Sequence, residues 1–387
     1  MRKMLALSLA AIIMAGCGSK KEKDSYVISG DIQGIPDSTM VELYPMSHSK
    51  SDPIAEAMVI GGKFEFSGKA EEPILVMLKV KDNYGSTRFM LENADIQIKG
   101  NASAEDVADG KKDYDFKDIT VQGSPLTDKY NELMSGRNEL DRQFLAMRES
   151  YSDIMEITTG SDKGKSDSVR ATERFKAMLA EEGRLFAAFD SVFNAVVREN
   201  KDSFWGPLMM MAQVTYLSPA NRELYEVLSD SAKNSHYGQM VYKELYPLGR
   251  PGDKVPDFTA TDIKGGKISL SEIAKANKYV LVDFWASWCR PCRAEIPNVK
   301  AIYDKHHADG FEIVSVSIDE EENPWIKAVE KEGLVWPNAR DTDKSIAGKY
   351  NVTAVPTMVV IDSEGKLVAE NLRGEELAAK IDELMSK

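Results

Sequence analysis

Apolar residues occur in short runs along the first part of the chain, from Tyr26 to about Gly123, and turn residues separate the runs. Each run has the length of a strand, which is typical of an all-β domain. The pair Gly61-Gly62 favours a tight hairpin turn. We therefore expect residues 26–123 to form a small antiparallel β-sandwich or barrel, with strands at 26–30, 40–44, 63–66, 74–80, 88–91 and 95–98.

Helical periodicity replaces this pattern from Ser124 onward. Apolar residues recur three, four or seven positions apart, first from Leu126 to Ile154 and then from Phe175 to Val196, as on one face of a helix. Ser124 and Pro125 suit the cap and first turn of the first helix. Residues 124–248 are thus predicted to be a helical segment, in which two long helices pair as an antiparallel hairpin and shorter helices follow at 203–217, 219–228 and 237–248.

The run Gly249-Arg250-Pro251-Gly252 marks the clearest domain boundary, because Gly and Pro interrupt regular structure. Beyond it strands alternate with helices, which predicts a central sheet with helices on both faces. An apolar strand at 279–286 leads into a helix at 291–307. Residues 251–387 are therefore expected to be an α/β domain, with a hairpin at 260–270, strands at 311–318, 357–361 and 367–370, and helices at 324–332, 344–350 and 375–385.

The first residues have the pattern of an export signal. Arg2 and Lys3 precede an apolar run from Met4 to Met14, which is too short for a permanent membrane helix. The sequence Met14-Ala15-Gly16-Cys17 resembles the lipobox of bacterial lipoproteins, in which the cysteine is acylated and becomes the first mature residue. An ordinary signal peptide with a chance cysteine is the alternative. We expect residues 1–17 to be a lipoprotein signal peptide and residues 18–25 to be a polar tether.

A lipidated Cys17 implies a cell-envelope protein, since several acyl chains anchor a protein stably to a membrane. Gly18 stands where an aspartate is associated with inner-membrane retention in Gram-negative systems, so we expect the outer membrane, facing the periplasm. The formal net charge of −13 over 387 residues argues against nucleic acid as a partner, because phosphate binding relies on clustered Lys and Arg.

Cys289 and Cys292 are the candidate reactive residues. They lie one turn apart where the apolar strand gives way to a helix, so a disulfide can close between them. The helix N-terminus favours an anion at Cys289, which makes Cys289 the expected nucleophile. Cys292 is then expected to resolve the mixed disulfide. Pro291 costs little in the first helical turn, where its missing N–H has no partner.

Two other uses of a paired cysteine motif fit poorly. A c-type haem site needs a histidine after the second cysteine, where Arg293 stands. A structural zinc site needs two more ligands, but the chain has no second cysteine pair and its four histidines are scattered. With Cys17 lipidated, all three cysteines are accounted for. We expect no metal and no cofactor beyond the redox-active disulfide Cys289–Cys292.

Around this motif, residues 251–387 resemble the thioredoxin-fold module of TlpA/ResA-like envelope thiol-disulfide oxidoreductases, in the AhpC/TSA and Redoxin superfamily. The β-rich region resembles the domain of unknown role that often precedes such modules. The resemblance rests on the opening 251–258, the run 282–289, the cysteine pair, Glu295-Ile296-Pro297 and Val355-Pro356-Thr357.

Two acidic residues are candidates for tuning the cysteines. Asp283 is a charge inside an apolar strand, so burial should raise its pKa and make it the proton acceptor for Cys292. A solvated aspartate at a strand edge is the alternative. Glu295 matches a glutamate that tunes the cysteines in the resembled family, although ordinary stabilisation of the first helical turn also explains it.

The remaining site residues are expected to contact substrate. Pro356 resembles the cis-proline that faces the disulfide in this fold, where the backbone of Val355 can bind an extended substrate. Trp288 is expected to shield the sulfurs and offer a flat apolar contact, beside Arg290 and Pro291.

The implied function is a protein-disulfide oxidoreductase. The reduction potentials of reducing and oxidising members differ by roughly 150 mV, or about 7 kcal/mol of thiolate stabilisation. The charge of Arg290 stabilises a thiolate by only about 1 to 4 kcal/mol at about 4 Å. We therefore expect a disulfide reductase that acts on protein substrates and needs an external electron donor, such as a membrane thiol reductase.

Two other functions are alternatives. One is a thiol peroxidase of the same fold, although Val282 and Ala286 stand where proline and threonine precede a peroxidatic cysteine. The other is a binding lipoprotein whose N-terminal half captures a partner or glycan.

Overall fold

The computed structural model describes residues 23–116 and 118–387, and the chain divides into two compact units. Of the described residues, the first unit comprises 23–116, 118–216 and Val227–Ala232, and the second comprises Leu217–Glu226 and Lys233–Lys387. The expected signal peptide, the lipidation site Cys17 and most of the expected tether lie outside the described residues. None of the described helices is both long and apolar enough to cross a membrane.

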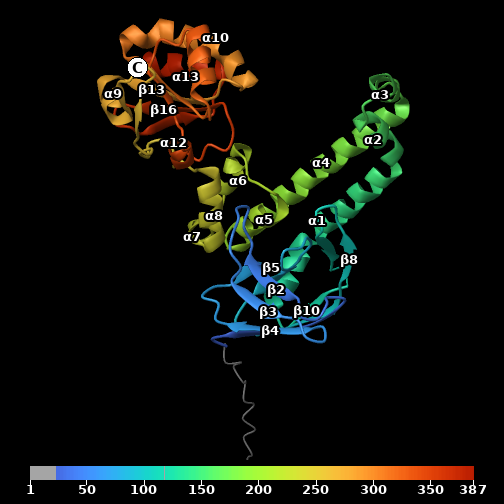
Figure 1. The fold of residues 1–387 in the computed structure, drawn as a ribbon. Helices are drawn as coiled ribbons and strands as arrows, with labels where there is room; N and C mark the ends of the chain where they lie inside the picture. Colours follow the sequence, from blue (N-terminus) through green and yellow to red (C-terminus); the bar gives the residue numbers. More distant parts are fainter. Residues whose placement is uncertain (1–22, 117) are drawn as a thin grey trace, which may run out of the picture. The chain divides into compact units, whose positions relative to one another are not determined.

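The β-rich part of the first unit is a sandwich of two four-stranded sheets (Figure 1). Alternate residues of its strands are buried, as Ile28 and Ile32 are on β1 and Phe64 and Phe66 are on β4. One sheet has the order β10-β7-β1-β4 and the other β3-β2-β5-β6. The strands are β1 (Tyr26–Gln33), β2 (Met40–Pro45), β3 (Ala55–Met58), β4 (Lys63–Gly68), β5 (Ile74–Val80), β6 (Thr87–Leu91), β7 (Asp95–Asn101) and β10 (Thr120–Gln122), with a separate hairpin of β8 (Ser103–Asp106) and β9 (Lys112–Asp115).

One pair of strands corrects the expectation of a purely antiparallel sandwich. β1 and β7 are parallel, with Val27 opposite Asp95. Between them the chain crosses to the other sheet and forms β5 and β6, so β7 re-enters the first sheet in the direction of β1. The Gly61-Gly62 turn forms as expected, with paired backbone hydrogen bonds between Ile60 and Lys63 and positive φ at both glycines.

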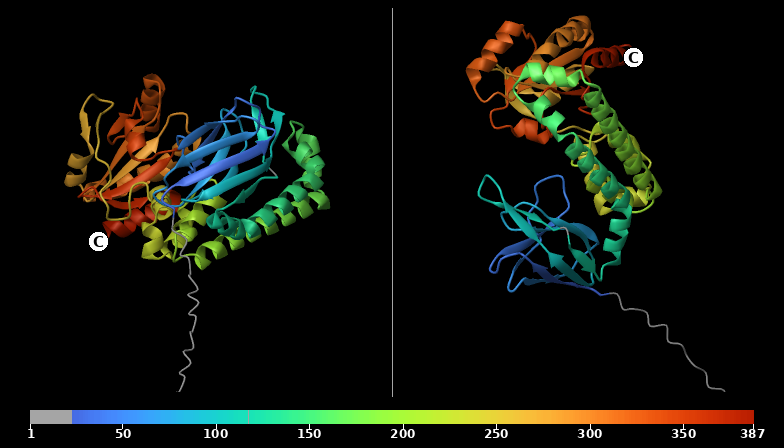
Figure 2. Two further views of the ribbon diagram at one scale, coloured as in Figure 1. Left: turned by 90° about the horizontal axis from the view of Figure 1, so that it is seen from below. Right: turned by 90° about the vertical axis from the view of Figure 1, so that its right-hand side faces the viewer.

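The helical hairpin of the first unit is present (Figures 1 and 2). Its long helices are α1 (Pro125–Ser150) and α4 (Glu173–Glu199), and Ser124 caps α1 by accepting the N–H of Thr127. The two helices are antiparallel, since Phe144 contacts Phe189 while Arg174 pairs with Asp153 further along. The first apolar stripe is interrupted at Tyr151, after which α2 (Ser152–Thr159) begins. The short helix α3 (Lys163–Arg170) follows before α4, and α5 (Trp205–Gln213) is buried throughout.

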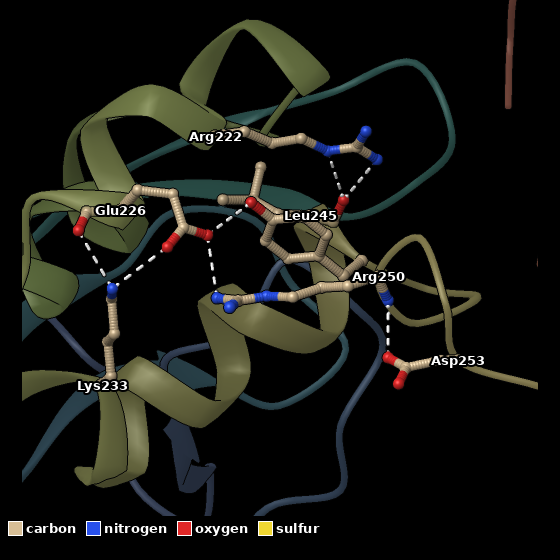
Figure 3. Close-up of polar contacts among 7 residues, drawn as sticks. Arg222, Glu226, Lys233, Leu245, Arg250 and Asp253 are labelled. Carbon is tan, nitrogen blue, oxygen red and sulfur yellow. Dashed lines mark hydrogen bonds and ion pairs between the residues drawn. The ribbon is translucent and has the colours of Figure 1, made fainter. Parts of the chain in front are cut away.

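The second unit begins with helices that the sequence placed in the helical segment: η1 (Pro219–Asn221), α6 (Arg222–Glu226) and α8 (His236–Leu245), while α7 (Asp230–Asn234) spans the division. Figure 3 shows their contacts. Arg222 donates twice to the carbonyl oxygen of Leu245, at 3.0 and 2.7 Å, and Glu226 accepts from Arg250 at 2.8 Å and from the Tyr246 hydroxyl at 2.7 Å.

These helices are also attached to the sheet of the second unit, because Arg222 pairs with the nearly buried carboxylate of Glu370. The compact unit therefore includes helices that precede the expected boundary of residues 249–252. The Gly and Pro residues there interrupt the helices, but the side chains on either side remain in contact.

The central sheet of the second unit has the order β15-β14-β13-β16-β17. β14 is parallel to its neighbours β13 and β15, and β16 is antiparallel to β13 and β17. The strands are β13 (Tyr279–Trp285), β14 (Phe311–Ser317), β15 (Asn338–Arg340), β16 (Thr357–Asp362) and β17 (Leu367–Glu370), with a separate hairpin of β11 (Thr259–Thr261) and β12 (Lys267–Ser269). This strand order is that of a thioredoxin fold.

Helices pack on both faces of this sheet, as the alternating pattern predicted. They are α9 (Leu270–Ala276), α10 (Arg290–His306), η2 (His307–Asp309), α11 (Glu322–Glu332), α12 (Ser345–Lys349) and α13 (Gly374–Met385). Leu281 and Trp285 of β13 belong to the cluster that includes residues of α10, α11 and α13, whereas Val282 and Phe284 belong to the cluster of α9 and α12. β13 is therefore buried from both sides, which explains its continuous apolar run.

Candidate active site

The cysteine pair lies where β13 gives way to α10, and it forms a disulfide (Figure 1 shows the two elements). The S–S distance is 2.05 Å and the Cα atoms are 5.3 Å apart. Cys289 is the N-cap of α10, and its sulfur accepts the backbone N–H of Cys292 at 3.1 Å. A helix N-terminus offers free N–H groups, so the sulfur of Cys289 occupies a position that stabilises negative charge.

The disulfide is shielded, and its neighbours reach the solvent. Cys289 and Cys292 are each 4% exposed, whereas Trp288 is 67% exposed and Arg290 and Pro291 are also exposed. The apolar partners of the cysteines include Trp285, Ile296 and Met358. A substrate must therefore approach across the rim formed by Trp288, Arg290 and Pro291.

The loop before β16 faces the disulfide. The carbonyl oxygen of Val355 lies 3.6 Å from the sulfur of Cys289. In the disulfide this sulfur carries no hydrogen, so it forms no hydrogen bond with the Val355 oxygen. After reduction, a Cys289 thiol at the same place has a hydrogen to donate to that oxygen. The Val355–Pro356 peptide bond is cis, and Arg373 donates to the carbonyl oxygen of Pro356. The fold thus brings Val355 and Pro356 next to the cysteines.

Asp283 is a buried acid on β13. Asp283 is 7% exposed. It lies two positions from Leu281 and from Trp285, and residues two apart on a strand point to the same face, so its side chain lies on the sheet face that carries the cysteines. The Ser315 hydroxyl donates to it at 3.2 Å. The pKa of Asp283 is raised to about 7, and burial is the largest cause; the Ser315 hydrogen bond lowers the pKa and the charge of Glu295 raises it.

Glu295 has a structural role, which is to accept hydrogen bonds from two neighbouring segments. Its Oε1 accepts the side-chain amide of Asn298 and the backbone N–H of Gly374, both at 2.7 Å. Gly374 is the first residue of α13, so Glu295 connects α10 with the N-terminus of α13. Its charge also raises the pKa of Asp283.

Several residues of the site were missed from the sequence. Trp336 donates its indole N–H to Ser315 at 2.9 Å, which orients the hydroxyl that binds Asp283. Asp319 accepts hydrogen bonds from Ser287 in the turn before Cys289. A weak signal existed for Asp319, because it follows an apolar strand directly, but Trp336 looked like any core residue. Within the described part of the chain, no three His, Cys, Asp or Glu side chains are grouped so as to hold a metal ion.

The raised pKa of Asp283 predicts a pH-dependent stability. The carboxyl of the unfolded chain ionises near pH 4, whereas the folded one keeps its proton until about pH 7. Ionisation therefore favours the unfolded state as the pH rises through this window. Because Asn cannot ionise, Asp283→Asn should raise the free energy of unfolding by about 4 kcal/mol at pH 8 and by almost nothing at pH 4.

Urea unfolding followed by tryptophan emission measures this difference, since four of the five tryptophans lie in the second unit. An equal effect of the substitution at both pH values would contradict a neutral Asp283 in the folded protein at acidic pH.

Two segments of the chain match known families. Residues 251–370 match the AhpC/TSA family, and residues 26–130 match a domain of unknown function, DUF4369. The first match contains the disulfide, Asp283 and the Val355–Pro356 bond. The second covers the β-sandwich and the start of α1.

Curated relatives share the redox unit. The chain is 35% identical over 173 residues to the thiol-disulfide oxidoreductase ResA of Bacillus anthracis, a match that covers 43% of this chain and 96% of the relative. It is 33% identical over 117 residues to ResA of Bacillus subtilis strain 168, covering 30% of this chain and 64% of that protein.

Solved structures match the same region. The crystal structure of the thioredoxin domain of a thiol-disulfide oxidoreductase from Bacteroides vulgatus is 34% identical; the match covers 35% of this chain and 98% of that domain, with a TM-score of 0.34. The sequence matches identify the chemistry that the disulfide site suggests, namely protein-disulfide exchange. The chain belongs to the ResA thiol-disulfide oxidoreductases of the AhpC/TSA family.

Proposed function

We propose that this oxidoreductase is a lipid-anchored disulfide reductase that faces the periplasm and acts on protein substrates. The observation that carries the proposal is the shielded disulfide at the N-terminus of α10, with Asp283 buried on the same face of the sheet and the Val355 carbonyl beside Cys289. Such a site suits attack by a thiolate followed by resolution within the same motif.

The catalytic cycle follows from the two cysteines. In the reduced enzyme the Cys289 thiolate attacks a substrate disulfide, RS–SR′; a bond forms between Cys289 and RS, and R′S⁻ leaves and takes a proton. Asp283 accepts the proton of the Cys292 thiol. The Cys292 thiolate then attacks the Cys289 sulfur, which closes the disulfide and releases RS⁻. Two electrons pass from the dithiol to the substrate, and an external dithiol donor restores the reduced enzyme.

The charges around the cysteines favour the reducing direction. A disulfide site is strongly oxidising when its thiolate is strongly stabilised. The helix N-terminus and the exposed Arg290 stabilise the Cys289 thiolate, but Arg290 is exposed to solvent, which screens its charge. The carboxylates of Asp283, when ionised, and Glu295 act in the opposite sense. Reduction of substrates is therefore the favoured role.

The surface beside the disulfide supports a protein substrate. Trp288 offers an exposed aromatic face, and large apolar side chains of this kind dominate the binding energy of protein contacts. Val355 is partly exposed and offers its backbone to an extended segment. Together they suit a polypeptide that is held across the sulfurs while its disulfide is attacked.

A trapping experiment tests the catalytic cycle. Cys292→Ala should stop at the mixed disulfide, because no second thiol remains to release the substrate. With insulin as the probe and dithiothreitol as the donor, wild type should reduce the insulin disulfides. Cys292→Ala that is reduced beforehand and freed of dithiothreitol should accumulate an insulin chain linked to Cys289, seen by mass spectrometry. Cys289→Ala is the control and should do neither. Failure of the wild type to accelerate insulin reduction would sink the proposal.

The anchoring part of the proposal rests on the N-terminal sequence. The short apolar run and the lipobox-like ending at Cys17 support export and acylation. An anchored reductase in an oxidising compartment needs electrons from outside, and a membrane thiol reductase is the class of donor that suits this placement.

Substitution of Cys17 tests this anchoring. Expressed in a Gram-negative host, the wild type should incorporate labelled palmitate and sediment with membranes, and Cys17→Ala should lose the label and leave the membrane fraction. Cys289→Ala is the matched control and should remain labelled. If the wild type carries no label, or if Cys17→Ala keeps it, the anchor is wrong while the redox chemistry is unaffected.

A further inference from the structure

A carboxylate from the neighbouring strand holds the turn that carries Cys289. Asp319 follows the end of β14 and is 3% exposed. Its Oδ2 accepts the backbone N–H of Ser287 at 2.8 Å, and its Oδ1 accepts the Ser287 hydroxyl at 2.6 Å. Both polar groups of one turn residue are therefore bound by a single side chain.

Asp319 is itself fixed in place. The Ser317 hydroxyl donates to Oδ2 at 2.6 Å and accepts the backbone N–H of Asp319 at 3.0 Å. A buried carboxylate is costly unless its oxygens accept hydrogen bonds, and here three neutral donors supply them. A carboxylate held from both sides cannot rotate without losing these bonds.

The bonds to Asp319 extend the sheet into the active-site turn. The backbone ladder between β13 and β14 continues to a bond from Ile318 N–H to the Trp285 carbonyl, at 3.0 Å. Beyond it, the side chain of Asp319 takes the next N–H, that of Ser287. The Asp319 carboxylate thus accepts a backbone N–H of the turn, as a backbone carbonyl of β14 accepts one within the sheet.

The turn determines how the reactive residues are presented. The N–H of Cys289 donates to the carbonyl of Ala286 at 3.1 Å, so residues 286–289 form a four-residue turn with Ser287 and Trp288 at its centre. Trp288 is 67% exposed, so core packing alone does not orient it. Fixing Ser287 therefore fixes the direction of Trp288 relative to the sulfur of Cys289.

We propose that Asp319 is a positioning residue for protein substrates: through Ser287 it sets the placement of Trp288 beside Cys289, and with it the rate at which a protein disulfide is captured. This inference rests on the proposed reductase function. A small disulfide needs access only to the sulfur of Cys289, whereas a polypeptide also has to meet the surface of Trp288. The contribution of Asp319 should therefore be larger for protein than for small disulfides.

The test compares two substrates in single-turnover assays of the reduced full-length protein. Asp319→Asn removes the negative charge and turns one acceptor oxygen into a donor NH₂, so one of the bonds that Ser287 and Ser317 donate to the carboxylate must reverse or be lost, and the others weaken. We expect the rate constant for insulin to fall about 10-fold, since small misplacements cost one to two orders of magnitude, while that for the small disulfide dithionitrobenzoate falls less than about 2-fold. A general loss of folded protein would lower both equally.

A second buried carboxylate provides the matched control. Asp341 is also 3% exposed and lies next to the same strand, but it accepts the N–H of Ala347 at 2.7 Å and so holds α12. Asp341→Asn should leave the ratio of the two rate constants unchanged. Ser287→Ala, which keeps Asp319 and loses only the hydroxyl bond, should change the ratio in the same direction as Asp319→Asn, and Ser287→Thr should restore it.

The outcomes separate this inference from the proposed function. If the wild type reduces insulin but Asp319→Asn and Asp341→Asn give the same ratio, Asp319 is structural only and the positioning role is wrong. If the wild type does not reduce insulin at all, the reductase proposal fails first. A fall in both rate constants by the same factor for Asp319→Asn, with Ser287→Ala unchanged, also overturns the positioning role.

Discussion

The start of α10 determines where the chemistry of this protein takes place, because Cys289 is both the cap of that helix and half of the disulfide. β13 is buried on both faces and ends where the cysteine motif begins, so the motif lies at the edge of a rigid core. The sulfur accepts a helix N–H, which favours its thiolate after reduction. The shielding of the pair, the facing Val355 and the exposed rim all follow from this placement.

Two buried carboxylates lie near this site, one on β13 and one just after β14, and their surroundings differ. Asp283 has one neutral hydroxyl as its hydrogen-bond donor, so burial dominates and its pKa rises to about 7. It can therefore take and return a proton near neutral pH. Asp319 is held by three donors from Ser287 and Ser317 and anchors the turn. Ionisation of the first carboxylate therefore lowers stability as the pH rises, and the second carboxylate holds the turn before Cys289.

Local sequence signals predicted much of this molecule. The run of β13, the cysteine spacing and the Ser124 cap each depend on a few neighbouring residues, and Asp283 stood out as a charge among apolar ones. The missed features depend on contacts between distant residues. The parallel pairing of β1 with β7 follows from a crossover. The start of the second unit at Leu217 follows from ion pairs such as Arg222 with Glu370. The hydrogen bonds of Asp319 with Ser287 join segments that follow two different strands. The strands β8 and β9 were not predicted, because they are largely polar and their apolar residues do not alternate with polar ones.

The reduction potential of the Cys289–Cys292 pair tests the central claim most directly, because it measures how far the helix N-terminus and the nearby acids balance each other. Equilibration of the full-length protein against glutathione, with the thiols counted by mass spectrometry, gives this value. A reductase requires a potential more negative than about −200 mV. A potential near about −120 mV, typical of a strong oxidant, would contradict the account.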